Sequence, residues 1–234
     1  MSYARPTAIL VDDSSLTRAS LPALMPELEF VGSFSTADEC VGHGSRADVT
    51  VLELERADKC VNEVRHGLDG LRRAIRAGHR ACVYTQEPRP FIHAACLAAG
   101  AKGVVSRAKP LDVAEKAFLE VAHGHAIISQ GLVIAFDQLP RRHQLAMLTP
   151  QQRSVLSARA RALPSPAIAG MLHLPAHQVQ LEWRRICSAI SRFLQRGDLS
   201  VATGVLGLPT DDLADLWPRR QSVASESARI GQPA

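Results

Sequence analysis

Four short apolar runs in the first half of the chain are each followed by side chains that can take part in binding or catalysis. These side chains are Asp12 and Asp13, Glu53, Thr85 and Arg107. Carboxylates and hydroxyls accept hydrogen bonds, whereas a guanidinium offers a planar fork of N–H donors that matches a carboxylate. If the four runs end close together, their polar side chains line one pocket. Arg107 can then bind the Glu53 carboxylate with two hydrogen bonds and hold that pocket closed.

The apolar runs themselves have the composition of β-strands that are covered on both faces. They cover residues 8–11, 30–33, 49–52, 81–84 and 103–106. Segments with helical character separate or follow them, at residues 15–25, 36–42, 61–77, 91–99 and 111–123. This alternation predicts an α/β fold, a five-stranded doubly wound parallel sheet with helices on both faces. The carboxyl ends of its strands meet at one edge, which would gather the polar side chains named above.

The second half of the chain is organised around three helical segments separated by two short breaks. The first covers residues 150–162. The second has its apolar positions within 168–172, and the third has its apolar positions from 179 and runs to about 196. Ser165 is expected to cap the second helix, and Pro166 fits its first turn, where a missing N–H costs nothing. The break at residues 173–175 is too short to cross a domain, so the second and third helices must lie across each other. An all-α helix-turn-helix domain is therefore predicted to follow the sheet.

This helical stretch resembles the DNA-binding domain of LuxR/NarL-type regulators over about forty residues. The matching residues are Leu148, Thr149, Pro150, Arg153, Val155, Leu156, Leu163, Ile168, Ala169, Leu172, Val179, Ile186 and Ile190. The alternative interpretation is a generic three-helix bundle.

The polar side chains at the strand ends, together with the segment 98–107, resemble the phosphoacceptor receiver domain of bacterial response regulators. The resemblance implies that Asp12 and Asp13 hold Mg²⁺ and that Thr85 reads a bound phosphoryl group. Glu53 stands where that family has its phosphoacceptor aspartate, and Arg107 stands where it has a lysine.

Both departures affect the switch that the resemblance implies. Glutamate places its carboxylate roughly 1.5 Å further out than aspartate, and phosphoryl transfer depends on in-line positioning. We therefore predict a receiver that phosphorylation does not switch, with Glu53 holding one conformation. The alternative is that Glu53 is a plain acid at a sheet edge and that the domain serves as a dimerisation platform. Without a phosphoryl group, Mg²⁺ loses its main partner.

The third helix of the second half is expected to enter the major groove of DNA. Its outward-facing residues are predicted to be His177, Gln178, Gln180, Leu181, Arg184 and Arg185. Glutamine can pair with adenine edges, arginine with guanine or phosphate, and leucine with a thymine methyl group. Arg153 is a candidate phosphate contact. The alternative for the arginines is a solvated helix face.

Two further residues depart from the LuxR pattern. Glu182 replaces a histidine that lies near the DNA backbone, where a carboxylate is expected to repel phosphate. Pro175 replaces a capping Ser or Thr, which removes a cap worth about 1 kcal/mol.

The composition permits a nucleic-acid partner without requiring one. The 234 residues carry a formal net charge of +4, and 46% of them are hydrophobic. No apolar run approaches the length of a membrane span, and the first residues lack a signal-peptide pattern. The cysteines are odd in number and have no metal-like spacing, so we expect buried reduced thiols in a cytoplasmic protein. They are Cys40, Cys60, Cys82, Cys96 and Cys187.

Five regions are predicted along the chain. They are a receiver-like domain at 1–123, a linker at 124–146, the helix-turn-helix domain at 147–197, a helical extension at 198–217 and a disordered tail at 218–234. In the linker, residues 126–134 suggest a helix packed on one domain, and residues 140–143 suggest an exposed segment. In the extension, Leu213, Leu216 and Trp217 share one face. We expect this face to pack on the helix-turn-helix or on a partner subunit; the alternative is a weakly ordered appendage.

The leading interpretation is a transcription regulator that binds double-stranded DNA as a homodimer. The alternative is a protein-interaction module that acts on a partner regulator or a sensor kinase without strong DNA binding. An enzyme is disfavoured, because no nucleophile–base pair is evident outside the pocket.

Overall fold

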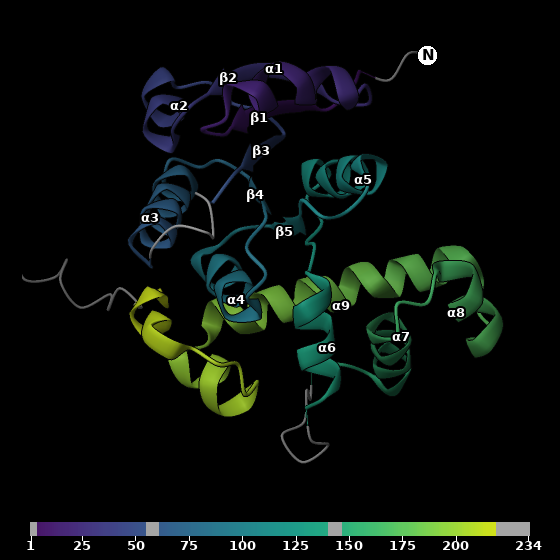
Figure 1. The fold of residues 1–234 in the computed structure, drawn as a ribbon. Coiled ribbons are helices and arrows are strands. Elements are labelled where there is room, and N and C mark those ends of the chain that lie inside the picture. The colour runs from purple at the N-terminus through teal and green to yellow at the C-terminus, as the bar shows by residue number, and fades with distance from the viewer. Residues whose placement is uncertain (1–3, 55–60, 140–146, 219–234) are drawn as a thin grey trace, which may run out of the picture.

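A computed structural model of the chain describes residues 4–54, 61–139 and 147–218, which form an α/β unit followed by a helical unit (Figure 1). The strands are β1 (Thr7–Val11), β2 (Glu29–Phe34), β3 (Val49–Leu52), β4 (Ala81–Thr85) and β5 (Gly103–Ser106). They pair in parallel in the order β2-β1-β3-β4-β5. This is a doubly wound order, so the predicted fold class is confirmed.

Helices cover both faces of the sheet. They are α1 (Ser15–Leu24), α2 (Ala37–His43), α3 (Val61–Arg76), α4 (Pro90–Ala99) and α5 (Leu111–Ala122). Leu21 of α1 and Phe118 of α5 belong to the buried cluster on one face, and Leu68 of α3 and Phe91 of α4 belong to the cluster on the other. Strands β3 and β4 are buried along their whole length, because neither sheet face meets water there.

The helical unit contains the three predicted helices, preceded by a helix of eight residues. They are α6 (Gln130–Asp137), α7 (Pro150–Ala160), α8 (Ser165–Leu172) and α9 (Ala176–Arg196). Thr149 and Gln152 form a reciprocal capping box at the start of α7. His173 ends α8 in the left-handed conformation, with φ of 53°. Pro175 precedes α9 without a side-chain cap, as predicted.

The predicted cap of α8 is wrong. Pro164 holds the N-cap position and Ser165 is the first helical residue. The Ser165 hydroxyl instead accepts a hydrogen bond from Arg159 Nη2 at 2.5 Å. Pro166 does lie in the first turn of the helix, as expected.

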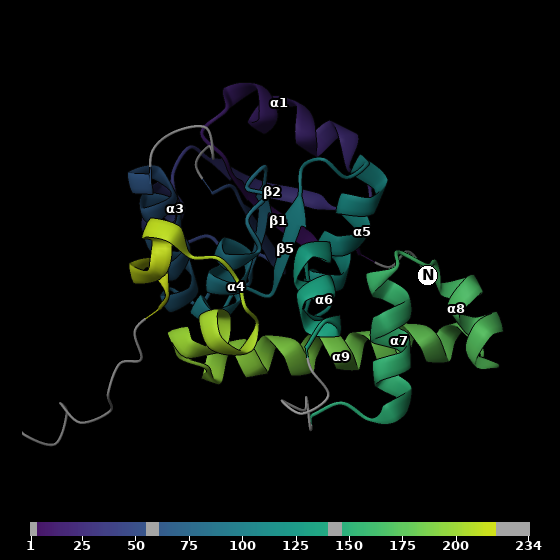
Figure 2. The ribbon, with the colours of Figure 1, turned by 60° about the horizontal axis from the view of Figure 1, so that its bottom comes forward.

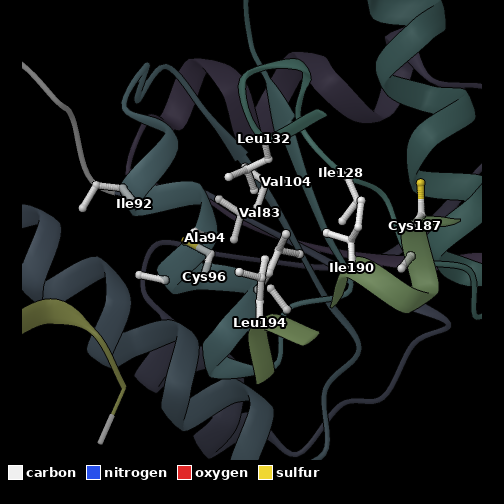
Figure 3. Packing of buried hydrophobic residues seen from close by; sticks show 14 of the residues in the cluster. Val83, Ile92, Ala94, Cys96, Val104, Ile128, Leu132, Cys187, Ile190 and Leu194 are labelled. Carbon is white, nitrogen blue, oxygen red and sulfur yellow. The ribbon is translucent and has the colours of Figure 1, made fainter. Parts of the chain in front are cut away.

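One hydrophobic core continues from the sheet into the helical unit. Helix α9 runs along the α4 side of the α/β unit (Figure 2), and Figure 3 shows Leu194 of α9 near Ala94 and Cys96 of α4, and Ile190 of α9 beside Ile128. Helix α6 contacts both α4 and α7, and its Gln130 donates hydrogen bonds to the carbonyl oxygens at the end of α7. The two units therefore form a docked pair in this structure.

The C-terminal extension packs on the α/β unit, which differs from the prediction. A π-helical turn η2 (Val201–Val205) leads to a 3₁₀ helix η3 (Asp211–Leu216), and η3 contacts α3. Arg72 of α3 donates to the Leu216 carbonyl at 2.6 Å, and the rings of Trp217 and Phe91 lie 5.9 Å apart. The predicted apolar face is correct, but it is the receiver-like unit that buries it. Trp217 Nε1 also reaches the Gly197 carbonyl, so the extension bridges both units.

The remaining predictions concern the linker, the cysteines and the C-terminal tail. The linker helix is α6, which begins at Gln130, later than expected; Ile127 instead forms a bridge with Gly103. Residues 140–143, for which an exposed segment was predicted, lie outside the described residues, as do Cys60 and the tail from 219 onward. The other four cysteines are buried free thiols.

Candidate functional site

The carboxyl edge of the sheet brings together four of the five predicted pocket residues. The Arg107 guanidinium forms ion pairs with Asp12 through Nη2 and with Glu53 through Nε, and Thr85 donates a hydrogen bond to Glu53. Asp13 is exposed and lies at the rim of this cluster. The predicted Arg107–Glu53 ion pair is present, but the predicted clamp of two hydrogen bonds is not. Arg107 meets Glu53 through Nε alone, and the buried Glu53 Oε2 has no hydrogen-bond partner among the described residues. Arg107 also shares its single charge with Asp12.

Burial sets the electrostatics of this pocket. Asp12 is 2% exposed, and the Glu53 side chain is 9% exposed. Burial raises the pKa of Glu53 from its ordinary value of 4.5 to about 7. Arg107 and the Thr85 hydrogen bond oppose that rise, whereas Asp12 and Asp13 add to it. Charging Glu53 is therefore costly, because its carboxylate is buried and the charge of Arg107 is shared with Asp12.

The residues present do not fit the Mg²⁺ site that the receiver resemblance implies. One Asp12 oxygen pairs with Arg107, and the other accepts the backbone N–H of Ser14 at 2.9 Å. Within residues 4–54, 61–139 and 147–218, no group of three or more acidic, histidine or cysteine side chains is placed to hold a metal ion. A divalent ion would have to displace the guanidinium to reach both carboxylates.

A cavity of about 350 Å³ opens beside the pocket, between the strand ends and helices α2 and α3. Asp13 and Glu53 line its sheet side, and His66, Asp38 and Arg73 line its helical side. Asp38 accepts a hydrogen bond from Arg73 Nε at 2.6 Å, which ties α2 to α3 across the cavity. Sequence periodicity offered no signal for this pair, since its members lie 35 residues apart.

A chain of hydrogen bonds leads from the pocket toward the helical unit. The Thr85 hydroxyl accepts the backbone N–H of Glu87 at 3.1 Å. The carbonyl of Glu87 accepts His93 Nε2 at 2.7 Å, and His93 Nδ1 lies 2.9 Å from the hydroxyl of Ser129. Ser129 is the N-cap residue of α6. Burial lowers the pKa of His93, which keeps the imidazole neutral and able to accept from Ser129.

The solvent-facing side of α9 forms a continuous ridge. Its exposed side chains recur at spacings of four or seven residues along the helix: His177, Leu181, Arg185, Arg192 and Arg196. The half-buried Gln178 and Gln180 flank the ridge, and Arg153 is exposed on α7. Most of the predicted DNA contacts are thus accessible.

The expectation that Glu182 faces DNA phosphate is wrong. Glu182 is 5% exposed. Its carboxylate accepts hydrogen bonds from Gln152 at 2.9 Å, from Gln178 at 3.1 Å and from Arg185 at 2.7 Å. These donors offset the charge of the buried carboxylate, and the Gln152 hydrogen bond joins α7 to α9.

The expectation that Arg184 faces outward is also wrong. Arg184 points to the α/β unit, where its Nε and Nη2 donate to both oxygens of Glu120 on α5 at 2.7 and 2.5 Å. His125 Nδ1 lies 2.9 Å from the same carboxylate. The Glu120 hydrogen bonds raise the pKa of Arg184, despite partial burial. Sequence reasoning missed Glu120 and His125, because helical periodicity does not tell which neighbour a helix face meets.

Comparison with known proteins gives structural likeness without sequence relatives. No family profile matches the chain, and no curated protein does. Similar solved structures include a two-component response regulator of the LuxR family from Aurantimonas sp. SI85-9A1, with 20% identity over 54% of this chain and 91% of that one (TM-score 0.46). The RcsB response regulator of Salmonella typhimurium is 16% identical over 80% of this chain and 92% of its own (TM-score 0.48).

A further structure, of two RcsB dimers bound to two parallel DNAs, is 16% identical over 90% of this chain and 96% of that one (TM-score 0.48). The architecture of this chain, a receiver-type sheet followed by a helix-turn-helix, resembles that of these response regulators. Within the described residues, no helix has the length and apolar character needed to span a membrane.

Proposed function

We propose that this chain is a cytoplasmic transcription regulator that binds double-stranded DNA through α8 and α9, probes sequence with the N-terminal half of α9, and works as a homodimer. The exposed ridge on α9 carries the proposal. A helix with an apolar side packed on α7 and α8 and an open side bearing His177, Leu181 and Arg185 has the layout of a recognition helix.

The residues of this ridge have distinct proposed roles. Leu181 can touch a thymine methyl group and Gln180 can pair with an adenine edge, which reads sequence. Arg185, at 57% side-chain exposure, and Arg153 suit phosphate contacts, which supply affinity and orientation. The Gln178 amide nitrogen donates a hydrogen bond to Glu182, so Gln178 can contact a base only when that hydrogen bond breaks.

The receiver-like unit is proposed to work without phosphorylation. Glu53 replaces the expected aspartate, and its carboxylate is paired with Arg107 in the structure. A buried carboxylate that is already paired with a guanidinium is a poor nucleophile toward a phosphodonor. We propose no enzymatic activity for the pocket.

One observation favours a second candidate function. Arg184 is held by Glu120, and the C-terminal half of α9 is docked on α4. A chain fixed in this arrangement would present the α9 ridge to a partner regulator or a sensor kinase and have little DNA affinity. The two candidates differ in whether Arg184 can leave Glu120.

Selection of bound fragments from sheared genomic DNA, followed by anisotropy titrations at several salt concentrations, tests the proposal. A DNA-binding regulator is expected to enrich a discrete motif and to lose affinity steeply as salt rises. Arg185→Ala and Leu181→Ala should weaken binding, whereas Arg76→Ala, an exposed arginine on α3, should not. Absence of enrichment, with equal affinity for all fragments, would favour the interaction module.

A further inference from the structure

The position of Arg107 in the pocket has a consequence for metal binding. Its guanidinium lies against Asp12 and Glu53, which come from the ends of β1 and β3. These are carboxylates that the receiver resemblance associates with a divalent ion and a phosphoryl group. In this chain the cation between them is part of the protein.

Several contacts hold the guanidinium in that position. Arg107 Nε also donates to the Tyr84 carbonyl at 3.3 Å, and its Cζ lies 5.0 Å from the centroid of the Tyr84 ring. The Arg107 side chain is 18% exposed. A planar group with several donors can meet two carboxylates, a carbonyl and a ring face at once, which the point charge of a lysine cannot do.

We infer that Arg107 is a resident counter-cation that takes the place of a divalent metal ion, so that the pocket excludes Mg²⁺ and Mn²⁺ and keeps one conformation without a phosphoryl group. This inference concerns the sheet-edge pocket alone and stands whether or not α9 binds DNA.

Charge and geometry both support the exclusion. A divalent ion needs oxygen ligands in its immediate shell, and the two buried carboxylates already use oxygens on the guanidinium. An ion that entered beside Arg107 would meet a positive charge in a water-poor pocket, where repulsion is weakly screened. Asp13 alone, exposed at the rim, would leave the ion almost entirely to water ligands.

The test is Mn²⁺ binding to the full-length chain, followed by the loss of the electron paramagnetic resonance signal of the free ion. Wild type and Asp12→Asn should give the same titration, because neither holds Mn²⁺ in the pocket. Arg107→Gln frees both carboxylates and should bind Mn²⁺ at least tenfold more tightly than wild type. Adding Asp12→Asn to Arg107→Gln should abolish that gain, whereas adding Asp112→Asn on the exposed face of α5 should not.

Two results would overturn the inference. One is a wild-type Mn²⁺ site that Asp12→Asn removes. The other is an Arg107→Gln chain that is folded by circular dichroism and gains no Mn²⁺ site. If Arg107→Gln does not fold, Arg107→Lys is used instead, because the single ammonium group of lysine leaves one of the two carboxylates unpaired. This variant must then show the same gain in Mn²⁺ affinity and the same dependence on Asp12.

Discussion

Two arginines of this molecule are each held by carboxylates, in surroundings that differ. Arg107 pairs inside the α/β unit with Asp12 and Glu53, whose side chains are 1% and 9% exposed. Arg184 pairs across the boundary between units with Glu120, and these side chains are 37% and 23% exposed. Water and salt screen the second pair far more than the first.

The difference separates a fixed element from an exchangeable one. Removing one partner of the buried cluster leaves an uncompensated charge away from water, so the cluster persists as long as the fold does. The boundary pair can give way to another anion at little cost, and DNA phosphates are such anions. We therefore regard the sheet-edge pocket as structural and the Arg184–Glu120 contact as the adjustable part of the molecule.

The largest expected effect comes from breaking the buried cluster. Arg107→Met should lower the free energy of unfolding by roughly 3–5 kcal/mol, the usual cost of orphaning a buried charge. Arg184→Met is the matched control and should cost less than about 1 kcal/mol. Denaturant unfolding measures both. Equal losses in the two variants would remove the distinction between the pairs.

The C-terminal extension contacts both units, and shortening its Trp217 side chain should give the next largest loss in the free energy of unfolding. Trp217 is 5% exposed and packs on Phe91, so Trp217→Ala should cost roughly 3 kcal/mol. The loss should come with faster hydrogen exchange in α9 and little change in β1 and β3. Leu111→Ala, at an exposed position of α5, is the control. Uniform loss of protection across the sheet would argue against a local role for the extension.

The sequence predicted what depends on local chemistry. Every strand and helix of the α/β unit lies within a residue or two of its expected bounds, because apolar runs and helical spacing set them. The clustering of Arg107 with Glu53 followed from strand ends meeting at one edge. The positions of Arg184 and Glu182 did not follow, because the neighbours of a helix face depend on docking between units. Ser165 failed as a cap because α8 begins one residue earlier than expected, so that Pro164 holds the N-cap position and Ser165 is already helical.

The raised pKa of Glu53 predicts a pH dependence of stability. The folded state binds the proton more tightly than the unfolded chain, so stability is fully present below about pH 4.5 and is lost as the pH rises through about 7. The contribution is at most about 3 kcal/mol. Glu53→Gln should remove this part of the pH dependence in denaturant melts at pH 5 to 8. An unchanged slope in that variant would assign the dependence to another group.

The smallest expected effect on stability comes from Glu120→Gln. The Arg184–Glu120 pair is partly exposed, so its loss should change the free energy of unfolding by less than about 1 kcal/mol, and raised salt should shrink the difference further. Thermal melts at low and high salt measure it. A loss of several kcal/mol would place this contact with the buried cluster.

We propose that Glu120 competes with DNA for Arg184, and the DNA affinity of Glu120→Gln tests this proposal most directly. Anisotropy on a selected operator should show the variant binding about three- to tenfold more tightly than wild type, equivalent to roughly 0.6–1.4 kcal/mol. Arg184→Met should weaken binding, and adding Glu120→Gln to it should bring no gain. Unchanged or weaker DNA binding by Glu120→Gln would contradict the proposal that Glu120 competes with DNA for Arg184.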